Sequence, residues 1–205
     1  VSWNSNTDAR TISSVTFTPD GGDAALPLSK VIEEKHGSNY RYAAIYSLLN
    51  PPSGQAGTVT IAFSGSVSAG IVAGAANFAG VDQTTPLGTA AGAYSPSSNT
   101  TATVTLSGLA GDELVFDTLF LGGNPPVTVT PDAGQTQIAD WNKTVANARG
   151  AASTEQAASD SVTMSWTAAS SSMWVISAVP INPAAAGATH TLTVAIDPAG
   201  GGTTA

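Results

Sequence analysis

Short runs of β-branched, aromatic and aliphatic residues, each closed by glycine or proline, constrain the fold of this chain more than any other feature. Residues 11–18 (TISSVTFT) end at Pro-Asp-Gly-Gly, which is turn chemistry, and residues 100–107 (TTATVTLS) alternate apolar and polar side chains. A period of two is the pattern of a half-buried strand. Residues 113–121 (ELVFDTLFL) are almost continuously apolar and suit a central strand. The pattern predicts an all-β fold: a two-sheet antiparallel sandwich, jelly-roll-like, with a C-terminal extension strand.

Three segments carry more specific expectations. In the strand expected at 58–64, we expect Val59, Ile61 and Phe63 to point inward. Residues 70–80 are rich in glycine and alanine, so we expect a strand that another backbone approaches closely, with a helix as the costlier alternative. Residues 161–167 and 172–181 are expected to pair as a hairpin around 168–171. The expected strands cover residues 1–4, 11–18, 28–35, 40–49, 58–64, 70–80, 100–107, 113–121, 127–130, 135–141, 145–153, 161–167 and 172–181.

A further strand pattern stands apart at the C-terminal end. At 205 residues the chain fits one large all-β domain, which we assign to 1–183, followed by a short linker and a strand within 184–205. Such a strand can complete the sheet of its own body, of a neighbouring molecule, or of a following module. We expect it to act as an assembly strand over 189–197. The residues that carry its pattern are Thr189, Thr191, Leu192, Val194 and Ile196.

Composition excludes several classes of function. The formal net charge is -8 and only six residues are basic, which argues against binding to nucleic acid or to anionic lipid. The absence of cysteine removes disulfides, thiol catalysis and cysteine-ligated metals. No apolar run approaches the roughly 20 residues of a membrane-spanning helix, so we expect no membrane insertion. Charged residues are 10% of the chain, against about 25% on average, which favours an extracellular or cell-surface protein.

No motif points to catalysis. A glycosidase needs two carboxylates about 5 to 10 Å apart in a cleft. Glu33 and Glu34 are neighbours on an expected strand and therefore point to opposite faces, while Asp112 and Glu113 follow a glycine and resemble turn residues. No Gly-x-Ser-x-Gly elbow is present. We expect no enzymatic activity and no cofactor.

Metal binding has weak support in the sequence. Asp20 and Asp23 could offer carboxylates to Ca²⁺, but the several further oxygens that calcium requires are missing from this loop, and a plain turn is the stronger interpretation. His36 and His190 lie in different segments and have no ligand spacing around them.

Carbohydrate is the best alternative ligand. Trp141 lies beside polar residues and could stack on a sugar ring, whereas Trp166 and Trp174 stand in apolar runs and are expected in the core. Asn99 and Asn142 each begin an Asn-x-Thr sequence, the acceptor pattern for N-glycosylation.

Two stretches also resemble known modules. Residues 41–54 (RYAAIYSLLNPPSG), 76–88 (ANFAGVDQTTPLG) and 161–166 (SVTMSW) resemble a β-sandwich module of large secreted and surface proteins of bacteria. Residues 191–202 (TLTVAIDPAGGG) look like the first strand of an internalin-type B-repeat. The resemblance implies a multi-module extracellular protein and brings no catalytic residues.

Together these features predict a structural protein of the cell surface. We expect a secreted subunit or module of a filament, adhesin or matrix, in which residues 189–197 join another sheet by donor-strand complementation. The expected partners are further copies of the chain, a neighbouring module of the same protein, and glycans, which could also make it a glycoprotein. The alternatives are a carbohydrate-binding module or, with less support, a glycan-active enzyme.

Overall fold

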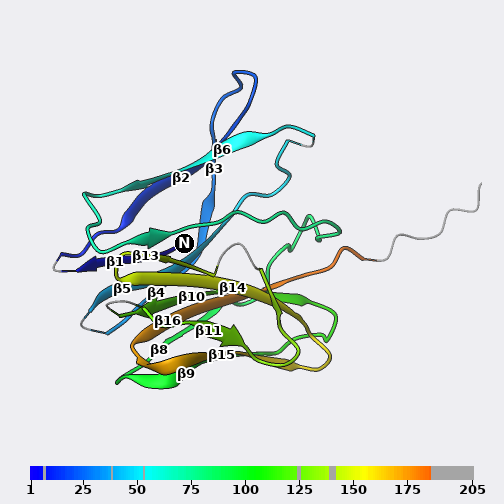
Figure 1. Cartoon of the computed structure of the whole chain (residues 1–205). Coiled ribbons are helices and arrows are strands. Elements are labelled where there is room, and N and C mark those ends of the chain that lie inside the picture. The colour runs from blue at the N-terminus through cyan, green and yellow to red at the C-terminus, as the bar shows by residue number, and fades with distance from the viewer. Residues whose placement is uncertain (7, 38, 53, 124–125, 139–141, 186–205) are drawn as a thin grey trace, which may run out of the picture.

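The computed structural model describes residues 1–6, 8–37, 39–52, 54–123, 126–138 and 142–185. All of the strand pairings in these ranges are antiparallel, which confirms the predicted all-β sandwich. The strands belong to four sheets rather than the expected two. Three of the sheets stack as layers of a body, and the fourth extends from it as an arm (Figure 1). Across the described ranges, no helix is both long and apolar enough to cross a membrane.

The middle layer of the body is the largest sheet. Its strands β10 and β16 are buried along almost their whole length on both faces, which is why their sequences are nearly continuous apolar runs. The predicted central strand at 113–121 is therefore confirmed. The order across the sheet is β12 (Thr136–Gln137), β14 (Ala148–Gln156), β10 (Leu114–Gly122), β16 (Trp174–Ile181) and β8 (Ala91–Tyr94), and β13 (Lys143–Val145) also pairs with β14.

One face of the middle layer is covered by a three-stranded sheet. The sheet consists of β11 (Val129–Pro131), β15 (Ser161–Ser172) and β9 (Asn99–Ser107), in that order. Alternate residues of β9 and β15 point into the core, and their neighbours face outward. This core contains Ala102, Val104, Leu106, Val115, Leu119, Leu121, Val162, Met164, Trp166 and Trp174. The prediction that Trp166 and Trp174 are core residues is confirmed.

The other face of the middle layer is covered by a four-stranded sheet. Its order is β4 (Ser29–Lys35), β5 (Tyr40–Ser47), β1 (Ser2–Asn6) and β7 (Ile71–Val72). Small residues allow the two layers to approach closely, as Ala43 of β5 packs with Phe120, Ala148 and Val175 of the middle layer. The strand β1 is paired on both sides, with β5 and with β7.

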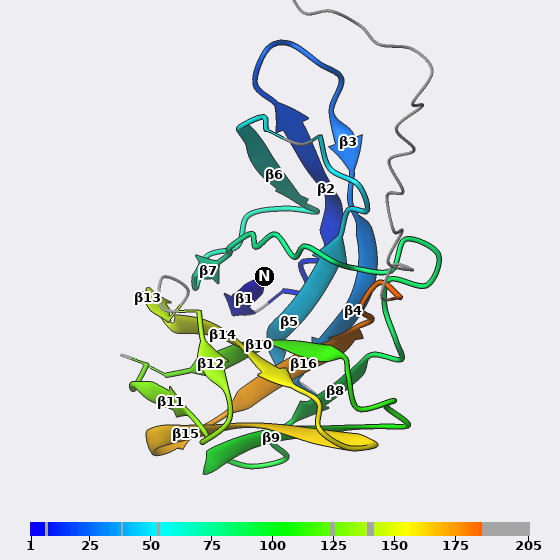
Figure 2. The same cartoon turned by 90° about the vertical axis from the view of Figure 1, so that its right-hand side faces the viewer.

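The arm is the fourth sheet. It consists of β3 (Leu26–Pro27), β2 (Ile12–Pro19) and β6 (Gly57–Phe63), with β2 in the middle. Within the described part of the chain, its strands pack extensively only on one another. Figure 2 shows the arm standing away from the layers of the body.

The predicted hairpin at 161–181 is wrong. The strand β15 pairs with β9 and β11 in the outer sheet, whereas β16 pairs with β10 and β8 in the middle layer. The two sequences differ in a way that fits these places. Residues 161–167 alternate as a half-covered strand does, and residues 174–181 are apolar throughout, as a strand covered on both faces must be. The turn-like residues 168–171 belong to β15, whose register with β9 shifts there, and Met173 alone separates β15 from β16.

The segment 70–80 is mostly irregular. Only Ile71 and Val72 form a strand, so the expected long strand is wrong, and the alternative helix is not found either. The expected close backbone approach is confirmed at Gly70, where an added Cβ would collide with the carbonyl oxygen of Val145. The φ of +117° at Gly70 also favours glycine.

Candidate functional site

The arm carries one apolar face and one threonine-rich face. In the pairing of β2 with β6, Val15 lies opposite Ile61 and Phe17 lies opposite Val59, while Phe17 also lies opposite Leu26 of β3. Directly opposite residues of an antiparallel pair share a face of the sheet. The five side chains therefore form one apolar face. The other face carries Thr16, Thr18, Thr58 and Thr60.

The apolar face of the arm is anchored to the body at its base. Phe63 continues the alternation of Val59 and Ile61, and its ring meets the indole of Trp3 edge-on, with 5.5 Å between the centroids. Trp3 is itself stacked on Tyr42 at 4.5 Å. Aromatic pairs of this kind are favourable beyond the area that they bury. The contact shows that the face carrying residues 59, 61 and 63 is directed toward the body.

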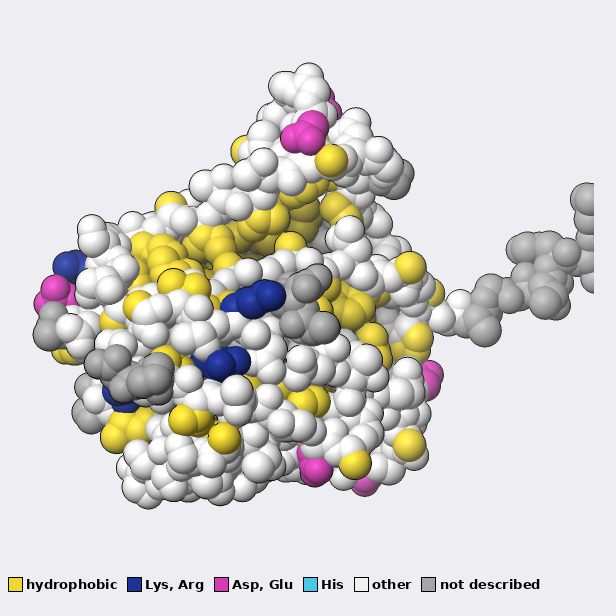
Figure 3. Space-filling model, in the orientation of Figure 1, with side chains coloured by type: hydrophobic (Ala, Val, Ile, Leu, Met, Phe, Trp, Pro, Cys, Tyr) yellow, Lys and Arg dark blue, Asp and Glu magenta, His cyan; other side chains and the backbone are white. Residues whose placement is uncertain are grey.

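Away from this base, the apolar face is progressively uncovered. Phe63 and Ile61 are half-buried, but 38% of Val59 is exposed, so the prediction that Val59 points into the core is wrong. Residues 59, 61 and 63 share one face of the strand, as the alternation predicts. Within the described chain, however, no sheet packs opposite the far end of β6. Figure 3 shows apolar side chains gathered in a hollow between the arm and the body. We call this the arm hollow: it is closed at Trp3 and opens toward Val59.

The outer edge of β6 is the second component of the site. In the described residues β6 pairs with β2 alone, and alternate residues of an edge strand direct their N–H and C=O groups outward. Proteins usually protect such edges with charges, proline or bulges. The edge strand β4 follows this rule with two lysines and two glutamates, whereas β6 (GTVTIAF) has neither charge nor proline.

The strand β9 offers a second uncharged edge. Among the described residues it pairs with β15 alone, on one side. Its apolar residues Ala102, Val104 and Leu106 are already buried in the core. A strand added beside β9 would therefore find the apolar face of its neighbour covered, whereas a strand added beside β6 would find it open.

Two of the predicted sites lie outside the described residues. These are the assembly strand, with Thr189, Thr191, Leu192, Val194 and Ile196, and the sugar-stacking candidate Trp141. His190 is also outside them. The assignments remain predictions.

The two N-glycosylation candidates differ in their surroundings. Asn99 begins β9, and its side-chain oxygen accepts a hydrogen bond from the indole N–H of Trp174 at 2.8 Å. The Nδ2 of Asn142, the atom that would carry a glycan, donates to Gln137 Oε1 at 3.2 Å, and Asn142 Oδ1 accepts from Arg149 at 2.6 Å. A glycan at Asn142 would compete with these contacts. Modification of either asparagine remains a prediction.

The candidate metal residues are not brought together with further ligands. Asp20 and Asp23 are exposed in the loop between β2 and β3. Among the residues that the structure describes, no group of three or more histidine and acidic side chains could hold a metal ion. His36 is buried, and its Nδ1 lies 3.0 Å from the side-chain nitrogen of Asn39. Burial, and then the charge of Arg41, lower the pKa of His36.

A buried carboxyl group in the core escaped the sequence analysis. Asp117 on β10 is fully buried, and it accepts hydrogen bonds from Trp166 Nε1 at 2.6 Å and from the backbone N–H and hydroxyl of Ser153 at 2.7 and 2.9 Å. Burial raises its pKa to about 7, although the three donors favour the charged form. Enclosed between two layers, Asp117 joins three strands and faces no open site. The sequence feature that indicates such a buried carboxyl group is a single acidic residue inside the apolar run 114–121.

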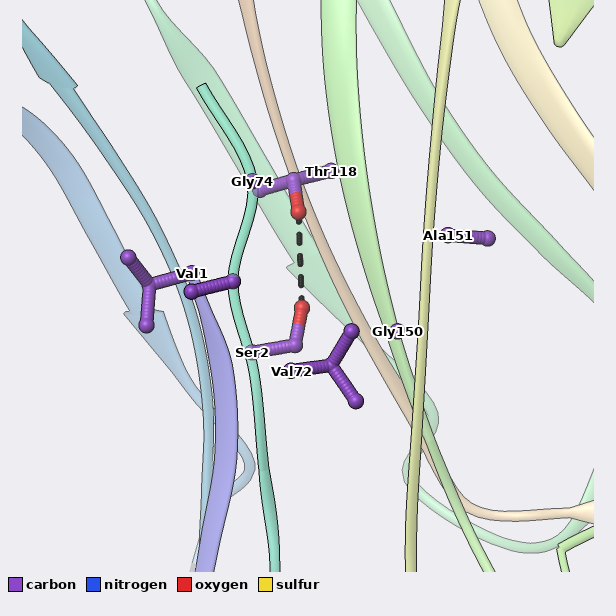
Figure 4. Close-up of a pocket in the computed structure, with 8 residues that line it drawn as sticks. Val1, Ser2, Val72, Gly74, Thr118, Gly150 and Ala151 are labelled. Carbon is purple, nitrogen blue, oxygen red and sulfur yellow. Dashed lines mark hydrogen bonds between the residues drawn. The ribbon is translucent and has the colours of Figure 1, made fainter. Parts of the chain in front are cut away.

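Two open pockets lie in the described body. The space among Ser2, Val72, Thr118 and Gly150 has a volume of about 10 Å³, which is room for one water at most. Figure 4 shows the hydroxyls of Ser2 and Thr118 directed toward each other there. A shallow groove of about 210 Å³ lies beside the end of the described chain. Its lining includes Phe78, Val81, Leu114, Ile181 and Pro183.

Comparisons with known proteins give no function for this chain. No family model matches it, and no curated protein or solved structure matches it either. The arm hollow and the edge of β6 are therefore the features on which a functional proposal can be built.

Proposed function

We propose that this chain is a structural protein of the cell surface or extracellular space, a subunit or module of a fibre, adhesin or matrix that assembles by β-strand addition. The observation that carries the proposal is the uncharged outer edge of β6, unpaired among the described residues of a chain that also contains a strand-patterned segment at 189–197. An added strand gains main-chain hydrogen bonds from the edge and specificity from its alternate side chains.

The composition of the chain supports the same proposal. A surface poor in charge and rich in serine and threonine suits a protein that works outside the cell, where threonine can keep an undocked strand soluble. A head-to-tail contact between identical copies does not close on itself unless its rotation allows a ring, so repetition gives a filament. The jelly-roll-like description of the sandwich remains a prediction.

Assembly of the full chain tests this proposal. Val194→Pro removes a backbone N–H from the middle of the donor segment and disfavours its pairing, whereas Thr203→Pro makes the same change beyond it. We expect light scattering and negative-stain electron microscopy to show linear oligomers for the unaltered chain and for Thr203→Pro, and monomers for Val194→Pro. A chain that stays monomeric at high concentration, or that assembles equally well with Val194→Pro, would contradict the proposal.

A further inference from the structure

We propose that the acceptor for residues 189–197 is the outer edge of β6 in a second copy of the chain, with Leu192, Val194 and Ile196 filling the arm hollow. This inference rests on the proposed function of strand addition and names the surface that receives the strand. It also assigns a role to the part of the arm beyond Ile12 and Phe63, the arm residues that pack on the Trp3 cluster of the body.

The donor and acceptor sequences have the same alternation. Residues 58–63 read Thr-Val-Thr-Ile-Ala-Phe, and residues 191–196 read Thr-Leu-Thr-Val-Ala-Ile. In each, three apolar side chains alternate with two threonines and an alanine. A strand placed beside β6 would continue the apolar face over the hollow and the threonine face on the outside. A shift by one residue would put threonines in the hollow, so this pattern also sets the register.

The other edges of the body fit this donor less well. The edge strand β4 carries Lys30, Glu33, Glu34 and Lys35, which oppose addition of a strand. The edge strands β3, β7 and β12 have two residues each, β11 and β13 have three, and β8 has four, all too few to pair with a nine-residue segment. The strand β9 is long enough, but its apolar face is already covered. Only β6 combines sufficient length, lack of charge and an uncovered apolar face among the described edges.

The position of the tail favours a second copy as acceptor. The last described residues are held against the body, since the N–H of Ala184 donates to the carbonyl oxygen of Gly80 at 2.7 Å and Pro183 bridges to Val81. Figure 2 shows this end on the side of β3 and β4, whereas β6 is the opposite edge of the arm. Three residues, 186–188, span about 11 Å at most. To reach its own β6, the tail would have to pass around β3 and β2.

Engineered cysteines test the contact directly, because the chain has none of its own. Thr60→Cys on β6 and Thr193→Cys in the tail are introduced into separate full-length chains, which are mixed and oxidised gently. Disulfides form only between Cα atoms about 4.4 to 6.8 Å apart. We expect a disulfide-linked heterodimer on non-reducing gels, with tryptic peptides of both sites joined in the mass spectrum. Thr58→Cys and Thr191→Cys cover a shift of register by two residues.

The matched control for cross-linking is Thr105→Cys, an exposed residue in the middle of β9. We expect it to give at least tenfold less heterodimer with Thr193→Cys than Thr60→Cys does. Equal or preferential linkage to residue 105 would overturn β6 as acceptor. In a chain with both Thr60→Cys and Thr193→Cys, a disulfide within one monomer would overturn the second copy as acceptor.

Lysine substitutions on adjacent residues of β6 give an independent measurement. Val59 points into the arm hollow and Thr58 away from it, and both are exposed, so neither change buries a charge in the free chain. We expect Val59→Lys to weaken assembly at least tenfold and Thr58→Lys to change it less than twofold, with unaltered circular dichroism for both. Equal assembly of the two variants, alongside loss of assembly in Val194→Pro, would reject the arm hollow but keep strand addition. Assembly that Val194→Pro leaves unchanged would reject both proposals.

Discussion

The middle layer of the body and the arm both contain strands of apolar side chains, but these side chains are buried in the middle layer and partly exposed in the arm. Val115 of β10 is fully buried between two layers, whereas 38% of Val59 of β6 is exposed, at the end of an apolar face that is buried at Val15 and half-buried at Phe63. Both strands read as apolar β-patterns in the sequence. The alternation of a strand therefore predicts which residues share a face. Whether that face is buried depends on the packing of other layers against it.

The largest loss of stability is expected for a substitution inside the buried middle layer. Replacement of Asp117 by alanine would leave the buried indole N–H of Trp166 and the backbone N–H of Ser153 without their acceptor. We expect the free energy of unfolding to fall by about 3 to 5 kcal/mol, as measured by urea denaturation. Asp160→Ala, at an exposed position, is the control and is expected to change stability by less than about 0.5 kcal/mol. A loss of similar size in both variants would contradict the buried network.

The same carboxyl group predicts a dependence of stability on pH. Burial raises the pKa of Asp117 to about 7 in the folded chain, so between its unfolded pKa and pH 7 the folded state binds more protons than the unfolded state. Its contribution is therefore fully present below about pH 4 and is lost as the pH rises to about 7, by up to about 4 kcal/mol. Asp117→Asn cannot titrate. Urea denaturation of both proteins from pH 4 to pH 8 should show this slope in the difference between them, and parallel profiles would contradict it.

Two glycines with nearly equal φ, one in the body and one in the arm, allow a comparison of these regions. Gly70 has a φ of +117° and faces the carbonyl oxygen of Val145, whereas Gly21, in the loop at the end of β2, has a φ of +116° and nothing within 4 Å of an added Cβ. Alanine at Gly21 adds only backbone strain, which we expect to cost about 1 kcal/mol, and alanine at Gly70 adds a collision, for about 3 kcal/mol. Thermal unfolding measures both. Equal losses would mean that the close approach at Gly70 is not maintained.

The smallest expected effect comes from matched valine substitutions. Val115→Ala removes two methyl groups from a filled core, and we expect a loss of about 2 kcal/mol. Val59→Ala removes them from the arm hollow, where we expect less than about 0.5 kcal/mol in the unassembled chain. In assembled material, the loss at Val59 should increase if a donor strand covers it. Urea denaturation below and above the concentration of assembly measures this change, and an identical small loss in both states would argue against a covered hollow.

Several predictions from the sequence failed for a common physical reason. The expected hairpin at 161–181 rested on two strand patterns with turn-like residues between them, but the strands pair with β9 and β10, which are far away in the sequence. The short strand β8, in a run of alanine and glycine, gave too weak a pattern to be identified. Pairing depends on contacts between distant segments, which no local pattern contains. The arm hollow was missed in the same way, since residues 59, 61 and 63 have a pattern that also suits a core.

The sequence by itself determined the all-β class, the central place of residues 113–121 and the burial of Trp166 and Trp174. It also determined which apolar residues of a strand share a face. These depend on side-chain period and hydrophobicity, which are local properties of the chain. The tertiary structure alone decided that the strands form three layers and an arm, that β15 and β16 belong to different sheets, and that β6 has an open edge above an uncovered apolar face. Coverage of a face is a relation between distant elements, so it exists only once the layers have packed.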